Sequence, residues 1–129
     1  MVTMRRVILI VGAPGSGKTT LAKRLTPRRL ERERYPSDHA FRAAVTRACA
    51  DPDADLAVIR CCPTPAEQAE WEALTQATEV IVMPTSKATC IRRVTARARP
   101  RWRGEIAAID HWFASRPDAH PAQSRRSEA

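Results

Sequence analysis

The sequence has few of the features that mark several common protein classes. No apolar run approaches the roughly 18 residues that a membrane-spanning helix needs, so a transmembrane protein is not expected. The four cysteines are Cys49, Cys61, Cys62 and Cys90; they form no CxxC pair, and no histidine is spaced to complete a zinc site with them. A structural metal is therefore not expected, and all four cysteines are predicted to be buried small apolar residues.

The first residues also lack the pattern of a secretion signal. Arg5 and Arg6 precede an apolar run, but this run covers only Val7–Val11, shorter than the roughly 7 to 15 residues of a signal-peptide core. No small-residue cleavage site follows it. We therefore expect a cytoplasmic protein with reduced thiols and no membrane partner.

Arginine, in contrast, is abundant. The chain has 22 Lys+Arg against 14 Asp+Glu, a net charge of +8, and 19 of the basic residues are arginine, whose planar guanidinium suits phosphate recognition. The charge is unevenly spread: residues 1–50 carry +8, residues 51–79 carry −6 and residues 87–129 carry +6. If the two basic blocks fold toward one face, that face attracts phosphorylated ligands.

Apolar runs alternate with amphipathic segments along the chain. The pattern predicts strands over 5–11, 34–36, 56–59 and 80–83, and helices over 18–30, 39–50, 64–77, 86–94 and 104–113. This alternation predicts parallel βαβ units, and hence a three-layer α/β/α fold with a small, mostly parallel sheet of about four strands. One domain is expected over residues 1–116, followed by a flexible polar tail over 117–129.

One segment matches a phosphate-binding motif in full. The motif GxxxxGK[ST] is matched by Gly12, Ala13, Pro14, Gly15, Ser16, Gly17, Lys18 and Thr19, between a predicted buried strand and a predicted helix. The glycines let backbone amides turn toward a phosphate, and the helix N-terminus adds partial positive charge. We expect Lys18 to reach the β- and γ-phosphates of ATP and the Thr19 hydroxyl to bind Mg²⁺, with Thr20 completing the nucleotide-binding segment.

From this motif onward the chain resembles the P-loop containing nucleoside triphosphate hydrolase superfamily. Within it, the chain is similar to small phage-type P-loop kinases of the polynucleotide kinase kind, and Pro14 fits the Gly-x-Pro-Gly-Ser-Gly-Lys form common among small kinases. The resemblance implies an ATP-dependent kinase with an AAA-type ATP-binding core. The acceptor would be a hydroxyl of a nucleic acid 5′ end, a nucleoside, a nucleotide or another small molecule.

The segment Tyr35–Arg42 resembles the part of these kinases that follows the second strand. The resemblance implies that Asp38 is the general base for the acceptor hydroxyl and that Arg42 contacts the substrate. Independently of the family, a carboxylate at the carboxyl edge of a parallel sheet can take a proton from a hydroxyl or hold a magnesium-bound water. Asp38 also suits a helix cap, and the two roles are compatible.

The arginine-rich stretch 92–104 resembles the lid of such kinases. Its arginines are Arg92, Arg93, Arg97, Arg99, Arg101 and Arg103. Arg93 and Arg97 share a helix face and are candidate catalytic residues, because a guanidinium stabilises charge that develops on the transferred phosphoryl group. Pro100 and Gly104 would bracket a mobile segment. A solvated basic helix end is the alternative interpretation.

The apolar strand Leu56–Ile59 lacks the carboxylate that ends the corresponding strand of many ATPases. It is followed by Arg60, and the nearby Asp53 and Asp55 precede it. Asp38 is then the one carboxylate expected near the phosphates, and Arg60 is expected to contact an anionic substrate or to form a surface ion pair. This lack supports an alternative function, a nucleotide-binding switch or partner-recruiting module with little or no catalysis.

Overall fold

The computed structural model describes residues 4–97 and 99–116, and the expected flexible tail lies outside the described residues. Four parallel strands and five α-helices are described. The strands are β1 (Arg6–Val11), β2 (Arg29–Glu31), β3 (Asp55–Arg60) and β4 (Glu79–Val82). The helices are α1 (Lys18–Leu25), α2 (Asp38–Ala50), α3 (Pro65–Thr75), α4 (Lys87–Arg97) and α5 (Trp102–Ala114). A short 3-10 helix, η1 (Arg32–Arg34), follows β2.

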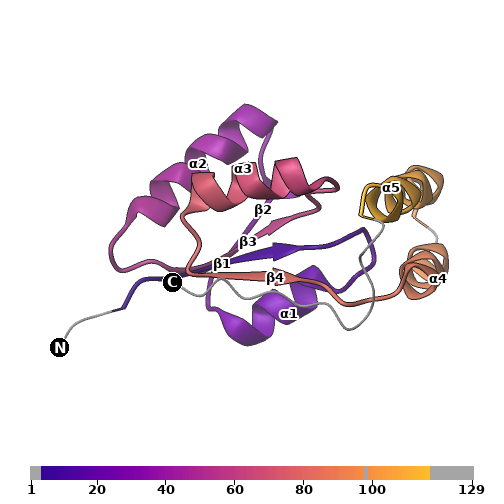
Figure 1. The fold of residues 1–129 in the computed structure, drawn as a ribbon, viewed down its shortest axis with the longest axis horizontal. Coiled ribbons are helices and arrows are strands. Elements are labelled where there is room, and N and C mark those ends of the chain that lie inside the picture. The colour runs from indigo at the N-terminus through magenta and orange to yellow at the C-terminus, as the bar shows by residue number, and fades with distance from the viewer. Residues whose placement is uncertain (1–3, 98, 117–129) are drawn as a thin grey trace.

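The sheet has the strand order β2-β3-β1-β4, so β1 lies between two partners. This position suits its apolar sequence, because both of its faces are covered. Val7, Leu9 and Val11 join one buried cluster, whereas Ile8 and Ile10 join a second one. Figure 1 shows α2 and α3 over one face of the sheet and α1 over the other. The predicted α/β class and parallel sheet of four strands are therefore confirmed.

The two remaining helices lie beyond one end of the sheet. The strands point toward α4 and α5, which pack against each other at the carboxyl edge (Figure 1). Cys90 and Val94 of α4 and Ile109 and Trp112 of α5 belong to the same buried cluster as β1. The carboxyl ends of the strands are thus faced by a helix pair that is part of the core.

Local chemistry explains where the helices begin. The Ser37 hydroxyl accepts a hydrogen bond from Ala40 N at the start of α2, and the Thr64 hydroxyl accepts one from Glu67 N at the start of α3. Pro65 occupies the first turn of α3, where its missing N–H costs nothing. At α2 the cap is therefore Ser37, and Asp38 is free for other contacts.

The predicted second strand, 34–36, is wrong. The strand is Arg29–Glu31, and the helix expected to reach residue 30 ends at Leu25, two residues before Pro27. Leu30 is the one buried residue of this strand, which pairs with β3 between Ala57 and Ile59. A strand that is flanked by charged residues and buries a single side chain has no alternating pattern to reveal it.

Two further expectations are corrected. The last helix begins at Trp102, two residues before its predicted start at Gly104, so Gly104 does not border the segment between α4 and α5. Cys61 was expected to be buried, but its side chain is exposed at the carboxyl edge of the sheet, while Cys49, Cys62 and Cys90 are buried. Within residues 4–97 and 99–116, no helix is both long enough and apolar enough to cross a membrane.

Candidate functional site

The glycine-rich loop, residues 12–17, joins β1 to α1. Gly15 and Gly17 have φ values of +79° and +93°, which lie in the left-handed region that side chains disfavour. Gly17 is also the N-cap of α1, and no side chain caps this helix among the described residues. The first N–H groups of a helix lack partners within it, so those of α1 are left for another acceptor, such as a phosphate.

Lys18 folds back over this loop. Its Nζ donates hydrogen bonds to the carbonyls of Gly12 and Ala13, at 2.7 and 2.9 Å, and lies 3.9 Å from Cys61 Sγ. The Ser16 hydroxyl is buried in the same loop and has no hydrogen-bond partner within the described residues. The loop thus brings together the Lys18 ammonium, the Ser16 hydroxyl and the first N–H groups of α1, which have no partners within the helix.

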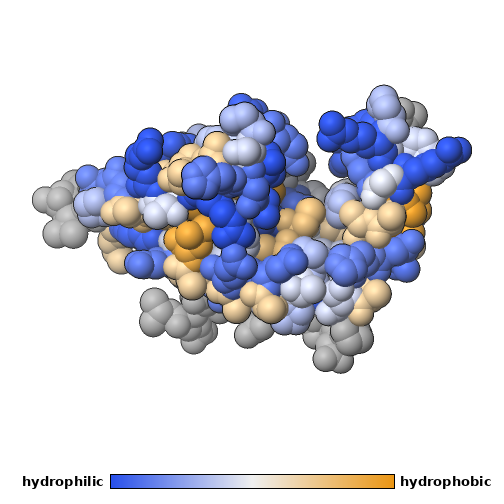
Figure 2. All heavy atoms as spheres, turned by 90° about the horizontal axis from the view of Figure 1, so that it is seen from above, coloured by the Kyte–Doolittle hydropathy of each residue, from blue (hydrophilic) through white to orange (hydrophobic). Residues whose placement is uncertain are grey.

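The loop opens on a cavity of about 660 Å³. Figure 2 shows the hollow between the body of the molecule and the part formed by α4 and α5. Lys18, Thr19 and Thr20 line one side, the ends of β2 and β3 another, and the end of α4 with the start of α5 a third. Its charged lining residues are Lys18, Glu31, Arg32, Glu33, Arg60, Glu67, Arg97, Arg99 and Glu105. The lining holds five basic and four acidic residues, and the basic ones stand on all three walls, where a large anion can contact them.

A carboxylate missed by sequence reasoning contacts Thr19. The Thr19 hydroxyl donates a hydrogen bond of 2.7 Å to Glu31 Oε1, and the other carboxylate oxygen of Glu31 lies 3.6 Å from Arg34 Nε. Glu31 was overlooked because the second strand was placed five residues too late, beyond this glutamate. A hydroxyl and a carboxylate side by side are the hard oxygen donors that Mg²⁺ prefers, so the residues present fit this ion.

Asp38 is held by three guanidinium groups. Arg42 Nε donates to its Oδ2 at 2.8 Å, while Arg60 Nη2 and Arg32 Nε lie 3.4 and 3.8 Å from its Oδ1. The hydrogen bond from Arg42, with the nearby charges of Arg60 and Arg32, holds the pKa of Asp38 below its ordinary value of 3.8. The carboxylate is therefore ionised at neutral pH and is a weak base.

Arg60 is fixed in place at the end of β3. Its guanidinium stacks 4.5 Å from the Trp71 ring centre and 5.6 Å from that of Phe41, and its side chain is 24% exposed. Gly12 N donates to its backbone carbonyl at 3.4 Å, so Arg60 lies directly beside the start of the glycine-rich loop. A preordered cation at this point can bind an anionic group entering the cavity.

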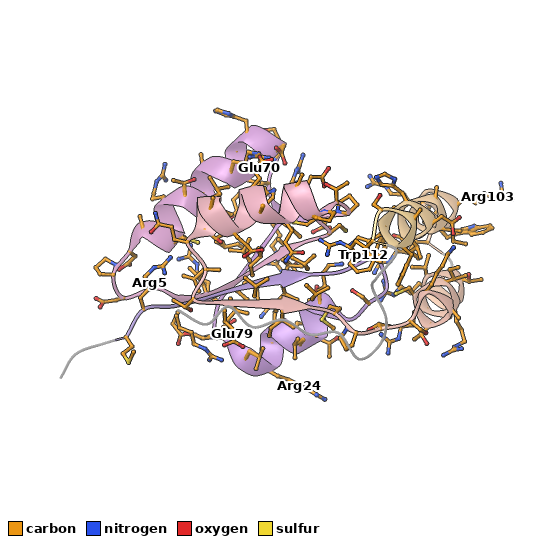
Figure 3. All side chains as sticks on the ribbon, in the orientation of Figure 1. Arg5, Arg24, Glu70, Glu79, Arg103 and Trp112 are labelled. Carbon is orange, nitrogen blue, oxygen red and sulfur yellow. The ribbon has the colours of Figure 1, made fainter. Side chains whose placement is uncertain are left out.

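The arginine-rich stretch approaches the loop through part of its length. Arg93 Nη1 donates to the Gly15 carbonyl at 3.2 Å, and Arg97 and Arg99 line the cavity. Arg99 also lies 3.7 Å from Glu105, whose Oε2 is buried and has no hydrogen-bond partner in the described part of the chain. Arg103 instead stacks on Trp102 at the outer side of α5 (Figure 3).

Helix α5 also anchors the loop that follows β3. Trp112 projects toward the end of the sheet (Figure 3), and its Nε1 donates to the Cys61 carbonyl at 2.7 Å. Arg116 Nη2 donates to the Cys62 carbonyl at 2.7 Å. Cys62 has a left-handed φ of 43°, and burial raises the pKa of its thiol to about 12. The exposed Cys61 thiol is thereby held at the cavity, facing Lys18.

The structure brings most of the predicted residues to one place. Pro14 to Thr20, Arg60 and Arg97 line the cavity, and Arg93 contacts the loop. Asp38 and Arg42 lie beside Arg60 but are not among the lining residues. The expectation that Asp38 would be the one carboxylate near the motif is wrong, because Glu31 contacts Thr19. No group of three or more candidate metal-binding side chains occurs within residues 4–97 and 99–116.

A scan against protein-family models and a search of curated protein sequences found no match to this chain.

Proposed function

We propose that the chain is an ATP-dependent kinase that transfers the γ-phosphoryl group to a hydroxyl acceptor. One observation carries the proposal: Lys18, Thr19 and the uncapped start of α1 lie on one wall of a cavity whose other walls bear Arg60 and Arg97. A polyphosphate needs backbone amides and cations converging from several sides, which this cavity supplies. The open volume leaves room for an acceptor beside it.

Some of these residues bind the nucleotide, and others stabilise the charge on the phosphoryl group during transfer. The N–H groups at the start of α1 and the Lys18 ammonium bind the phosphates, and the Thr19 hydroxyl would hold Mg²⁺. When bound, this ion neutralises charge on the phosphate oxygens. Arg93 and Arg97 steady the phosphoryl group during transfer, because they approach the loop from α4.

Asp38 orients the acceptor hydroxyl and takes its proton. Its lowered pKa makes it a weak base, but phosphoryl transfer passes through a loose transition state in which positioning outweighs proton removal. Arg60 and Arg42 hold this carboxylate and contribute positive charge to the acceptor side. The acceptor classes are a nucleic acid 5′ end, a nucleoside or nucleotide, and another small hydroxyl compound.

A second candidate is a nucleotide-binding switch or partner-recruiting module with little catalysis. It is favoured by the state of Asp38, whose two carboxylate oxygens are engaged by arginines and which does not line the cavity. A carboxylate whose oxygens are both engaged by arginines serves to hold Arg42 and Arg60 in place. ATP binding is common to both candidates, and phosphoryl transfer separates them.

The decisive experiment incubates the protein with γ-labelled ATP and a panel of a nucleoside, a nucleoside monophosphate and a 5′-hydroxyl oligonucleotide. The kinase proposal expects label on at least one hydroxyl, and transfer to none of them would favour the switch. Asp38→Ala is expected to lose transfer while retaining ATP affinity. Equal loss of both would assign Asp38 a structural role.

A further inference from the structure

The ends of two neighbouring strands carry an unexpected pair of charges. β3 adjoins β1 and ends in Arg60 in place of a carboxylate that could serve Mg²⁺. β2 lies one strand further out and ends in Glu31. The register places Glu31 opposite Ile59, immediately before Arg60. Both side chains reach the same cavity, so the carboxylate enters it from β2 and the guanidinium from β3.

We propose that Glu31 positions the Thr19 hydroxyl as a ligand for the Mg²⁺ that accompanies ATP. Glu31 would thereby replace the acidic residue that β3 lacks at its carboxyl end. This inference rests on the proposed function, because it concerns the same cavity and the same nucleotide. Glu31 lies outside the motif of residues 12–19, so the inference adds to the magnesium site a residue that the motif does not contain.

The hydrogen bond between the two side chains has the direction that a magnesium ligand needs. Thr19 Oγ1 donates its proton to Glu31 Oε1 at 2.7 Å, so the lone pairs of the hydroxyl oxygen are left for a cation. A hydrogen bond to an ionised carboxylate is stronger than one to a neutral acceptor and makes the donor oxygen more electron-rich. Outer-sphere partners of this kind orient metal ligands and tune their affinity.

The surroundings of Glu31 hold it ready for this contact. Its side chain is only 14% exposed, and Arg34 Nε lies 3.6 Å from its Oε2. Mg²⁺ keeps several waters and is bound by one or two protein oxygens together with substrate phosphates. Thr19 and Glu31, placed beside the glycine-rich loop, suffice for such a site without the cluster of acidic residues that a protein-only site would require.

The test compares ATP binding with and without the metal, using a fluorescent ATP analogue in excess MgCl₂ or in EDTA. Wild type is expected to bind more tightly with Mg²⁺. Glu31→Gln is expected to lower that gain by about 10- to 100-fold, the usual effect of removing an outer-sphere partner. In EDTA the same variant should bind as well as wild type or better, because a negative charge near the phosphates is gone.

Matched variants separate this role from general effects of charge and folding. Glu33→Gln removes a carboxylate that lines the same cavity two residues away, and should leave the Mg²⁺ gain unchanged. Thr19→Val should lose the gain, and the double variant Thr19→Val/Glu31→Gln should lose no more than Thr19→Val alone, because the pair acts as a unit. Unfolding midpoints confirm that each variant is folded.

Two results would overturn the inference while leaving the proposed function intact. One is a full Mg²⁺ gain in Glu31→Gln, and the other is an equal loss of affinity in MgCl₂ and EDTA, which identifies a purely structural contact. An absence of ATP binding by the wild type in both buffers would instead overturn the proposed function itself, and the inference with it.

Discussion

The glycine-rich loop and the arginine-rich stretch are both basic and both face the cavity, but they are built differently. The loop depends on backbone conformation: Gly15 and Gly17 adopt positive φ, and Gly15 lies against the backbone of α4. The arginine-rich stretch depends on long side chains, all of them exposed, and Arg93 is the one with a hydrogen bond to the loop. Substitutions in the loop are expected to disturb its backbone conformation. Most of the exposed arginines, in contrast, can be replaced without disturbing the fold.

The largest effect is expected from Lys18→Ala. Lys18 holds the Gly12 and Ala13 carbonyls and, under the proposal, two phosphates. Charged hydrogen bonds contribute about 1.5–3 kcal/mol each, so ATP affinity should fall by at least about 100-fold. Titration with the fluorescent ATP analogue measures this loss. Lys23→Ala, an exposed lysine in the last turn of the same helix, is the control and should bind normally. Retained binding by Lys18→Ala would refute the assignment of the motif.

Gly15→Ala tests whether the glycine-rich loop depends on its backbone conformation. A Cβ at this position would lie 2.7 Å from the Cys90 carbonyl oxygen, and φ is +79°, so the variant should lose at least about 2 kcal/mol of unfolding free energy. Urea unfolding measures it. Gly104→Ala is the opposite control: it meets no atom within 4 Å and lies inside α5, so it should gain about 0.5–1 kcal/mol. Equal stability of the two variants would contradict the close approach of the loop to α4.

Arg93→Gln tests the contribution of a single arginine side chain to phosphoryl transfer. Because Arg93 reaches the Gly15 carbonyl, we expect at least about a tenfold fall in the rate of phosphoryl transfer, with a smaller change in ATP affinity. Lys87→Gln removes a cation from the same helix, one that pairs with Asp110 at 3.0 Å, and should leave the rate unchanged. If both variants slow transfer equally, α4 acts through its overall charge and Arg93 has no specific role in transfer.

The smallest effect concerns the acid stability of the Asp38 cluster. The pKa of Asp38 is below its ordinary value of 3.8, chiefly because of the Arg42 hydrogen bond. Its contribution to stability is therefore complete above that ordinary value and is lost as pH falls through the lowered one. At neutral pH, Asp38→Asn should be less stable than wild type by under about 1 kcal/mol, since the carboxylate is half exposed. The two stabilities should converge as the pH falls through the lowered pKa of Asp38. Unfolding curves over a series of acidic and neutral pH values measure the difference, and a constant difference would show that the arginines do not stabilise the charged form.

The fold was predictable where the sequence pattern has a single structural solution. The short, β-branched apolar run 7–11 before a glycine-rich turn favours a strand covered on both faces, and Pro65 after Thr64 marks the start of a helix. The strand 29–31 was missed because it buries one residue and depends on pairing with β3 for its conformation. Pairing between distant segments leaves no local signal in so short a strand.

The same limit applies to the candidate site. The loop of residues 12–17 could be recognised because all its residues lie in one short stretch of the chain, and two of its glycines, Gly15 and Gly17, adopt the positive φ that glycine permits. The contact of Glu31 with Thr19, and the stacking of Arg60 on Trp71, join residues from different elements. Their partners depend on strand order and register, which the sequence pattern left undetermined. Asp38 was therefore the candidate carboxylate, because it follows the wrongly placed strand 34–36 and fits the resemblance to small kinases.

The hydrogen bond from Trp112 to the Cys61 carbonyl has a practical consequence. It joins α5 to the residue whose thiol lies 3.9 Å from the Lys18 ammonium. Replacing Trp112 with phenylalanine would remove this donor, and the loop that holds the Cys61 thiol beside Lys18 would lose one of its two anchors from the C-terminal part of the chain.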